Sequence, residues 1–317
     1  MGAGENSRLL FEIEGKPNRA WLFKKLRSHV AVYADAIRIE FDGACDLYAR
    51  NDIFDIYVLE PATEDIAVRT TFIHFYDKGD QNYYILTDDI FPGLAEKMEH
   101  ALRNEGSWSY IPEKHAYPKT VQWFVACCAI AHISCRENPY VFGGQYKEPS
   151  GIADARQALY ESWGFNNKQD LLDMLPDLLE GRTVKEYREL MDGDELLDDD
   201  KRDLYAYIDA CGGERCFWAF DLQRLILLGE CGYLSDWLSW EDACAWCLKA
   251  GHKLQRLYGS WDEFMDHYLL IYGFWAEESM EDAGSQVYKF KQIYEYYTTL
   301  RTHPWQIAWN HPLTQEW

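Results

Sequence analysis

The pattern of hydrophobic residues changes from strand-like to helix-like along this chain of 317 residues, and this change constrains the fold more than any other feature. Short stretches rich in β-branched and aromatic residues, typical of strands, occur at residues 36–41, 53–59, 68–76 and 83–87. From residue 152 onward, hydrophobic residues recur every three or four positions, which is the spacing of one helix face. The pattern predicts an α+β protein, with a small mixed N-terminal domain followed by a larger all-α helical domain.

Residues 1–110 are predicted to form the small α+β domain. One helix is expected over residues 18–34, where hydrophobic side chains share one side, and another over residues 90–103. Residues 77–80 between the last two strands predict a hairpin turn, because Gly79 readily adopts the positive φ that such a turn needs.

Residues 111–150 are predicted to be a linker that contains one connecting helix, and residues 151–317 to be the helical domain. Two domains agree with the chain length, on a prior of about 150 residues per domain. The connecting helix is expected over residues 120–135. Its apolar part, residues 121–133, is shorter than the about 20 residues that cross a bilayer, so we expect a buried helix and no membrane binding.

Capping signals divide the helical domain into successive helices. A helix over residues 152–163 is expected to stop at Gly164. Capping boxes are predicted at residues 183–186 and 260–263, where a hydroxyl and a Glu side chain each satisfy a free backbone N–H. A last helix is expected over residues 280–301.

Three segments of the helical domain share residue types and spacing with a known family. They are residues 159–165 (LYESWGF), residues 219–224 (AFDLQR) followed by 232–234, and a longer segment from Trp246 to Trp309 that includes 260–261, Phe264, Tyr268, Gly273, Trp275 and 304–305. Together they resemble the DUF1266 family over about half of the chain. The resemblance implies an α-helical domain of bacterial proteins, and it implies no reaction and no catalytic residues.

The charge balance of the chain bears on its partners. The formal net charge is −22, from 53 acidic against 31 basic residues. Such a surface repels phosphate backbones and anionic lipids, so we expect no nucleic-acid and no membrane partner. It attracts a basic protein partner, although an acidic surface also serves solubility alone. The sequence leaves the oligomeric state open.

The nine cysteines and the first residues of the chain point to a reducing compartment. Residues 1–7 have neither the basic nor the apolar region of a secretory signal, so a cytoplasmic protein without a disulfide framework is expected. Cys244 and Cys247 have the spacing of a redox pair, but they lie inside a predicted helix, where buried core thiols are the alternative. A second such pair, which a zinc site would need, is absent.

Asp221 and Arg224 are three residues apart and therefore share one face of a predicted helix. Leu225 and Leu228 lie on the same side, which indicates partial burial. One interpretation is an ion pair that fixes helix packing, since a carboxylate accepts two hydrogen bonds from a guanidinium. The other is a polar patch inside an aromatic cleft.

A stripe of aromatic residues recurs every three or four positions along a predicted helix: Trp261, Phe264, Tyr268, Tyr272 and Trp275. Such a stripe forms either a core or a groove for a ligand or peptide, because Tyr and Trp carry a polar tip on an apolar body. Trp305 belongs to a C-terminal tail that is expected to pack back onto the helices.

Residues 192–203 carry seven acidic side chains. The order of ligands, glycine and glutamate of a calcium-binding loop is missing, so a solvated face or a docking surface for a basic partner is expected, with no metal. The sequence also lacks a P-loop, a dinucleotide fingerprint, a nucleophile elbow and a zinc-protease motif.

These observations predict a non-enzymatic acidic protein-binding module, and more narrowly an immunity- or antitoxin-like protein that neutralises a basic toxin, and no cofactor. Asp221, Arg224, Trp261, Tyr268, Trp275 and Trp305 are the candidate contacts with a partner or ligand. The alternative is a hydrolase or transferase of unknown substrate with its site in the helical domain. A third hypothesis is a structural scaffold, which a large apolar patch and self-association would indicate.

Overall fold

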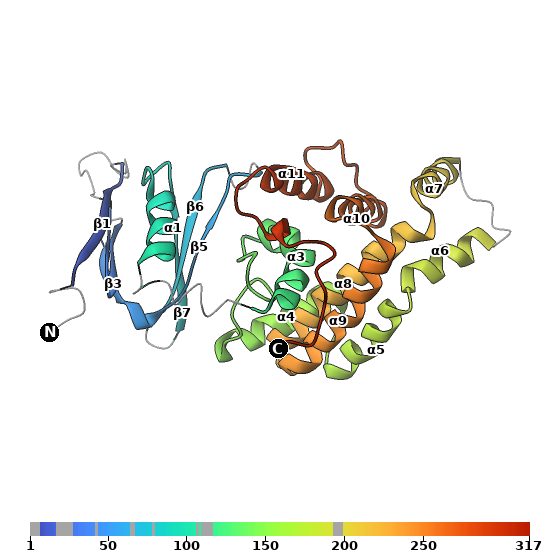
Figure 1. The fold of residues 1–317 in the computed structure, drawn as a ribbon, viewed down its shortest axis with the longest axis horizontal. Helices are drawn as coiled ribbons and strands as arrows, with labels where there is room; N and C mark the ends of the chain where they lie inside the picture. The colour runs from blue at the N-terminus through green and yellow to red at the C-terminus, as the bar shows by residue number, and fades with distance from the viewer. Residues whose placement is uncertain are drawn as a thin grey trace. The chain divides into compact units, whose positions relative to one another are not determined.

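The computed structural model describes residues 7–16, 28–41, 44–63, 67–77, 80–105, 108, 117–192 and 199–317. Two compact units, residues 1–116 and residues 117–317, make up the chain (Figure 1). The first contains two antiparallel sheets and a helix, and the second contains helices. The predicted α+β class, with the helical part second, is confirmed.

The N-terminal unit contains seven strands and helix α1 (Leu94–Asn104) in its described part. One sheet is ordered β1 (Leu9–Glu14), β2 (His29–Tyr33), β3 (Ala36–Phe41) and β4 (Ala44–Ala49). The other is ordered β5 (Ile53–Leu59), β6 (Thr70–Asp77) and β7 (Asp80–Thr87). Both sheets are antiparallel throughout.

The core of this unit is shared by both sheets and α1. Val30 and Val32 of β2 face the same side as alternate residues of β3, because side chains of a strand point to opposite faces in turn. Leu94 and Met98 of α1 contact this core, and α1 packs against strands of both sheets (Figure 1).

The strands predicted at residues 36–41 and 53–59 have those bounds in the structure, whereas β1 and β4 were not predicted. The helix predicted over residues 18–34 is wrong at its end, where β2 forms, because pairing with β1 and β3 buries Val30 and Val32. Its first part, residues 18–27, lies outside the described residues.

The predicted hairpin between β6 and β7 is confirmed, because Asp77 pairs with Asp80. Residues 78 and 79 themselves lie outside the described part. The helix predicted over residues 90–103 starts later, at Leu94, after Gly93 with a φ of +80°.

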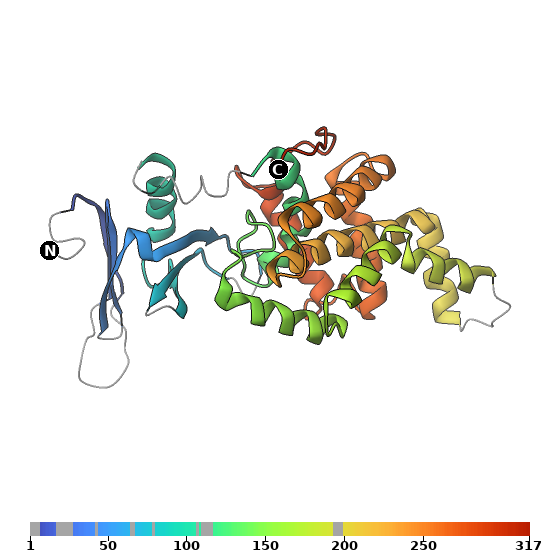
Figure 2. The same ribbon diagram turned by 90° about the horizontal axis from the view of Figure 1, so that it is seen from below.

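The helical unit consists of α3 (Lys119–Ser134), α4 (Ile152–Trp163), α5 (Lys168–Leu179), α6 (Arg182–Asp192), α7 (Asp199–Cys211), α8 (Glu214–Leu234), α9 (Trp240–Leu257), α10 (Trp261–Ala276) and α11 (Gln286–Thr298). Helix α8 is at the centre, since it packs against α3–α7, α9 and α10 (Figure 2). Its buried residues lie on all sides, as expected for a helix that other helices surround. Helix α11 covers α3 and α10.

Helix ends in this unit follow the capping residues in most places. Gly164 adopts a left-handed conformation and ends α4, as predicted. Ser260 accepts a hydrogen bond from the N–H of Glu263 and begins α10, while Glu263 reaches the N–H of Gly259. The last helix was predicted six residues too early, because Ser285 is the residue that caps α11.

Among the helices of the described residues, none is both long and apolar enough to cross a membrane.

Candidate functional site: an arginine between tryptophans

Three helices bring aromatic rings around the guanidinium of Arg224 on α8. The guanidinium carbon lies 4.5 Å from the ring centre of Trp163 and 4.8 Å from that of Phe220. The ring centre of Trp275 lies 5.7 Å away. A cation within about 6 Å of an aromatic face is attracted by the electron density of the ring. Trp163, Arg224 and Trp275 together are called the arginine–tryptophan cluster below.

The arginine–tryptophan cluster lies at the surface of the helical unit. Trp275, near the end of α10, is 57% exposed, whereas Phe220 beneath it is buried. Tyr160, one turn before Trp163 on α4, is 53% exposed. An exposed Trp, a Tyr and a held Arg are the side chains that most often dominate binding energy at protein interfaces.

Asp221 does not form the ion pair that was one interpretation of its spacing from Arg224. Its carboxylate is fully buried and accepts hydrogen bonds from the N–H of Thr183, at 2.9 Å, and from the Thr183 hydroxyl. Both bonds lie in the first turn of α6, where the free N–H groups and the helix dipole favour a negative charge. Asp221 therefore links α8 to the start of α6.

The same contacts correct the capping box predicted at residues 183–186. Helix α6 begins at Arg182, and Thr183 donates its hydroxyl to Asp221. Burial raises the pKa of Asp221 to about 6, against the hydrogen bonds from Thr183 and the charge of Arg224. A carboxylate from another helix thus performs the capping that the local sequence suggested.

Tyr268, Trp261 and Trp305 lie in the core of the helical unit. Their exposed fractions are 3%, 7% and 4%, so they present little surface to a partner. Tyr268 lies between Phe220 and Phe290, with ring centres 6.3 Å and 6.4 Å away. Of the aromatic stripe on α10, only Trp275 is exposed, so the stripe is mainly core.

The C-terminal tail packs back onto the helices, as predicted. The indole N–H of Trp305 donates to the carbonyl of Ala126 at 2.9 Å, and that of Trp309 donates to Tyr258 at 2.7 Å. Trp261 donates in turn to the carbonyl of Ile307. The tail thus satisfies the polar atoms of the indoles that it helps to bury.

A second polar site, which the sequence interpretation missed, lies inside the helical unit. The imidazole of His132 on α3 lies between two carboxylates, 2.8 Å from Glu137 and 3.0 Å from Glu230 of α8. His132 is 3% exposed and Glu230 is fully buried. Glu137, His132 and Glu230 are called the buried triad below.

The electrostatics of the buried triad follow from its depth. Burial by itself lowers the pKa of His132, but the two carboxylates raise it to about 10, so the imidazole is charged at neutral pH. Burial raises the pKa of Glu230, and the charge of His132 opposes this. The sequence did contain a signal for this site: a histidine and a glutamate each interrupt an otherwise apolar helical stretch. Because buried charges need partners, these two residues could have been predicted to pair.

A close backbone approach accommodates the buried triad. Gly144 follows Gly143, and both have positive φ, of +73° and +80°. A side chain at Gly144 would collide with Glu137 and His132. Glycine is therefore required there both by conformation and by space.

All nine cysteines are free thiols. Cys244 and Cys247 are fully buried, and burial raises the pKa of Cys244 to about 12 and that of Cys247 well above its ordinary value. Because the thiolate is the reactive form, the core interpretation of this pair holds.

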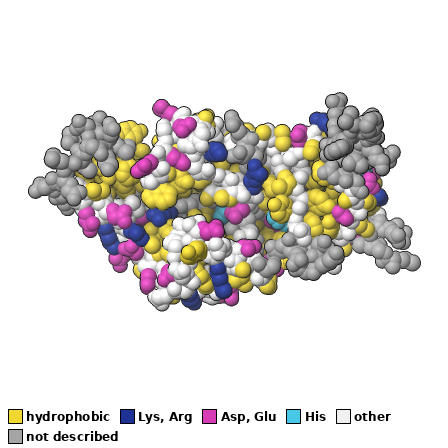
Figure 3. Space-filling view, turned by 180° about the vertical axis from the view of Figure 1, so that it is seen from behind, with side chains coloured by type: hydrophobic (Ala, Val, Ile, Leu, Met, Phe, Trp, Pro, Cys, Tyr) yellow, Lys and Arg dark blue, Asp and Glu magenta, His cyan; other side chains and the backbone are white. Residues whose placement is uncertain are grey.

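Within the described residues, no three His, Cys, Asp or Glu side chains are grouped to hold a metal ion. Six residues of the acidic segment 192–203, residues 193–198, lie outside that part of the chain. Elsewhere on the surface, acidic side chains lie beside hydrophobic ones on the face drawn in Figure 3.

The helical unit is thus an all-α domain with a polar triad inside and an arginine held by tryptophans at its surface. Residues 158–309 match the family described as "Protein of unknown function (DUF1266)", which confirms the resemblance predicted for the C-terminal half. No curated protein and no solved structure matches the chain.

Proposed function

We propose that this protein is a cytoplasmic, non-enzymatic binding module for a basic protein, with an immunity- or antitoxin-like role as its most specific form. The observation that carries the proposal is the arginine–tryptophan cluster, with Trp275 57% exposed on a chain of net charge −22. The rings supply a preorganised apolar contact, and the charge supplies steering.

The contacts within the arginine–tryptophan cluster support a role in binding. Trp163 and Phe220 hold the Arg224 side chain in one place, so little side-chain entropy would be lost when a partner binds to it. Trp275 leaves more than half of its surface exposed, so packing within the folded chain does not require a residue of this size at this position. Exposed tryptophans of this kind characterise the centre of an interface.

Co-expression with the product of the neighbouring gene tests the proposal. The tagged chain is purified and eluted in a salt gradient, which screens charge over about 10 Å at 0.1 M and about 3 Å at 1 M. We expect a 1:1 complex that survives moderate salt and dissociates at high salt. We expect Trp275→Ala to remove most of the complex.

Trp246→Ala is the matched control, because Trp246 is also partly exposed and also stacks with a cation, Lys249, at 3.9 Å. Equal loss of the complex in both variants would assign the effect to general surface hydrophobicity. If no basic protein forms a stable complex at any salt concentration, the proposed function is wrong. An immunity role further requires that the neighbouring product be toxic when expressed alone.

The alternative of a hydrolase or transferase depended on Asp221, Arg224, Tyr268 and Trp275 meeting in a cavity. In the structure, the buried carboxylate of Asp221 accepts a hydrogen bond from Thr183, and Tyr268 lies between the rings of Phe220 and Phe290. A raised pKa alone does not distinguish a catalytic carboxyl from a structural one. The geometry of these four residues therefore favours the binding module.

A further inference from the structure

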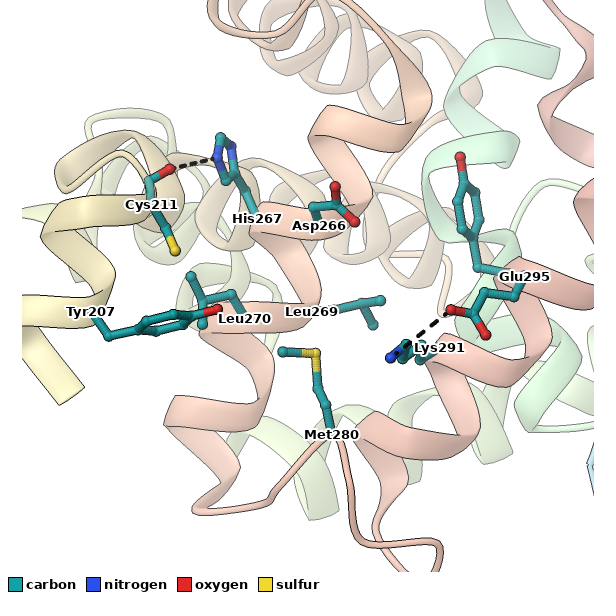
Figure 4. Close-up of a pocket in the computed structure, with 10 residues that line it drawn as sticks. Tyr207, Cys211, Asp266, His267, Leu269, Leu270, Met280, Lys291 and Glu295 are labelled. Carbon is teal, nitrogen blue, oxygen red and sulfur yellow. Dashed lines mark hydrogen bonds and ion pairs between the residues drawn. The ribbon is translucent and has the colours of Figure 1, made fainter.

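A cavity of about 420 Å³ lies in the helical unit between α7, α10 and α11 (Figure 4). Its volume is within the range of about 300–1,000 Å³ typical of small-molecule sites. The α10 residues that line it are Asp266, His267, Leu269 and Leu270. The α10 residue of the arginine–tryptophan cluster is Trp275, which does not line the cavity. The inference below is therefore independent of the proposed function.

The cavity has an apolar part. Leu269 and Leu270 of α10 and Met280 of the connection to α11 line it together with Tyr207, and Figure 4 shows Leu270 beside the ring of Tyr207. The two leucines are 5% and 9% exposed, so they belong to the packed framework. These side chains offer a contact for an aliphatic chain.

The charged groups of the cavity are two carboxylates and one ammonium. Lys291 lies 3.9 Å from Glu295, one turn along α11, and the two form an ion pair. Asp266 lies at the exposed edge, and none of the described side chains forms a hydrogen bond or ion pair with it. Asp266 is therefore the carboxylate available to a ligand.

Burial and the charge of Asp262 raise the pKa of Asp266, and the charge of Lys291 opposes this. Because Lys291 is already paired with Glu295, the two carboxylates of the cavity exceed its one ammonium by one negative charge. His267 donates its Nε2–H to the carbonyl of Cys211 at 3.1 Å, and burial lowers its pKa, which favours the uncharged ring. The hydroxyl of Tyr294 donates to Asp262, at 2.7 Å. An apolar surface next to an unpaired carboxylate is complementary to a cation on an aliphatic chain.

We propose that this cavity binds a primary alkylammonium group, with the nitrogen at Asp266 and the chain against Leu269, Leu270 and Met280. A free alkylamine and the side chain of a lysine share this chemistry. The cavity takes the group as a hydrogen-bond donor and cation, and no covalent step is involved.

Titration calorimetry of the full chain with n-hexylamine at pH 7.5 tests the proposal, with n-hexanol and hexanoate as neutral and anionic ligands of matched length. We expect saturable 1:1 binding of the amine, about fivefold tighter than hexanol, and no binding of hexanoate. Nα-acetyl-lysine amide distinguishes the two sources of the ammonium group. An affinity equal to that of n-hexylamine would indicate the lysine side chain of a protein, and a weaker affinity would indicate a free alkylamine. Absence of saturable amine binding, or equal binding of amine and alcohol, would overturn the proposal.

Two pairs of variants locate the site. Asp266→Asn should weaken amine binding about fivefold, whereas Glu189→Gln, which removes an exposed carboxylate on α6, should not. Met280→Lys should abolish binding, because it places a competing ammonium in the cavity and removes an apolar contact. Met191→Lys, at a methionine 45% exposed on α6, is its control. Unchanged binding in Asp266→Asn or Met280→Lys would refute the assigned site.

Discussion

Arg224 and Glu230 lie on the same helix, α8, yet their charges are accommodated in opposite ways. Glu230 is fully buried and lies 3.0 Å from a charged histidine. Arg224 remains partly exposed and lies against aromatic rings. A charge in the interior needs an opposite charge to offset its lost hydration, whereas a cation near water needs only the faces of rings.

This difference separates the roles that we assign to the two sites. The buried triad connects α3 to α8, and its His132 and Glu230 are buried, so we assign it a contribution to stability and packing. The arginine–tryptophan cluster exposes Trp275, and the contribution that we propose for it is recognition of a partner. The predictions below test whether stability and binding divide between the sites in this way.

The largest expected effect is that of His132→Ala. The change leaves Glu230 buried without its counter-ion, which costs about 3–5 kcal/mol in the free energy of unfolding. Urea denaturation followed by tryptophan fluorescence measures it. Eleven of the 13 tryptophans lie in residues 117–317, so the signal reports mainly the helical unit.

His252→Ala, on the exposed side of α9, is the control for His132→Ala. It removes one hydrogen bond to the carbonyl of Leu313 but leaves no buried charge, so it should cost about 1 kcal/mol. The double change His132→Leu with Glu230→Met should recover most of the lost stability, because it removes both charges. If the double variant is as unstable as His132→Ala, packing rather than charge explains the loss.

Gly144→Ala should be the next largest perturbation. It strains a backbone at a φ of +73° and forces a methyl group against Glu137 and His132. Strain of this kind costs about 1–3 kcal/mol. Gly164→Ala has the same φ of +73° with no atoms near the added carbon, so the difference between the two variants isolates the contact with the triad. Equal losses would show that the triad tolerates displacement.

The pH dependence of the stability that Asp221 contributes gives a third test. Its pKa is about 6 in the folded protein, against an ordinary value of 3.8. The folded state therefore binds the proton more tightly, and the stability contributed by Asp221 is full below pH 3.8 and lost as the pH rises through 6. The free energy of unfolding of the wild type relative to Asp221→Asn should fall between pH 4 and pH 6.5. A difference that is constant with pH, or that rises, would contradict burial as the cause.

The smallest expected effect on stability is that of Trp275→Ala. Loss of one partly exposed cation–π contact should cost less than about 1 kcal/mol in the free energy of unfolding. The same variant should lose the complex with the basic partner, which pull-down and denaturation measure on one preparation. A loss of stability comparable with that of His132→Ala would make Trp275 structural and remove the contrast between the two sites.

Much of the helical framework was accessible from the sequence, because its signals are local. Gly164 and Ser260 end or begin helices where the sequence predicts it, since a cap acts within one turn of its own residue. The strand at His29–Tyr33 was missed, because its conformation depends on pairing with strands on both sides.

The sequence by itself determined the α+β class, most helix ends and the family of the C-terminal half. The tertiary structure alone decided which polar residues meet. Spacing placed Asp221 near Arg224, but the carboxylate binds Thr183, 38 positions away, and Glu230 finds His132 98 positions away. The exposure of Trp275 and the burial of Tyr268 on one stripe were decided in the same way. Local sequence reports what a residue can do within one helical turn, whereas burial and partners depend on which other helices pack against it.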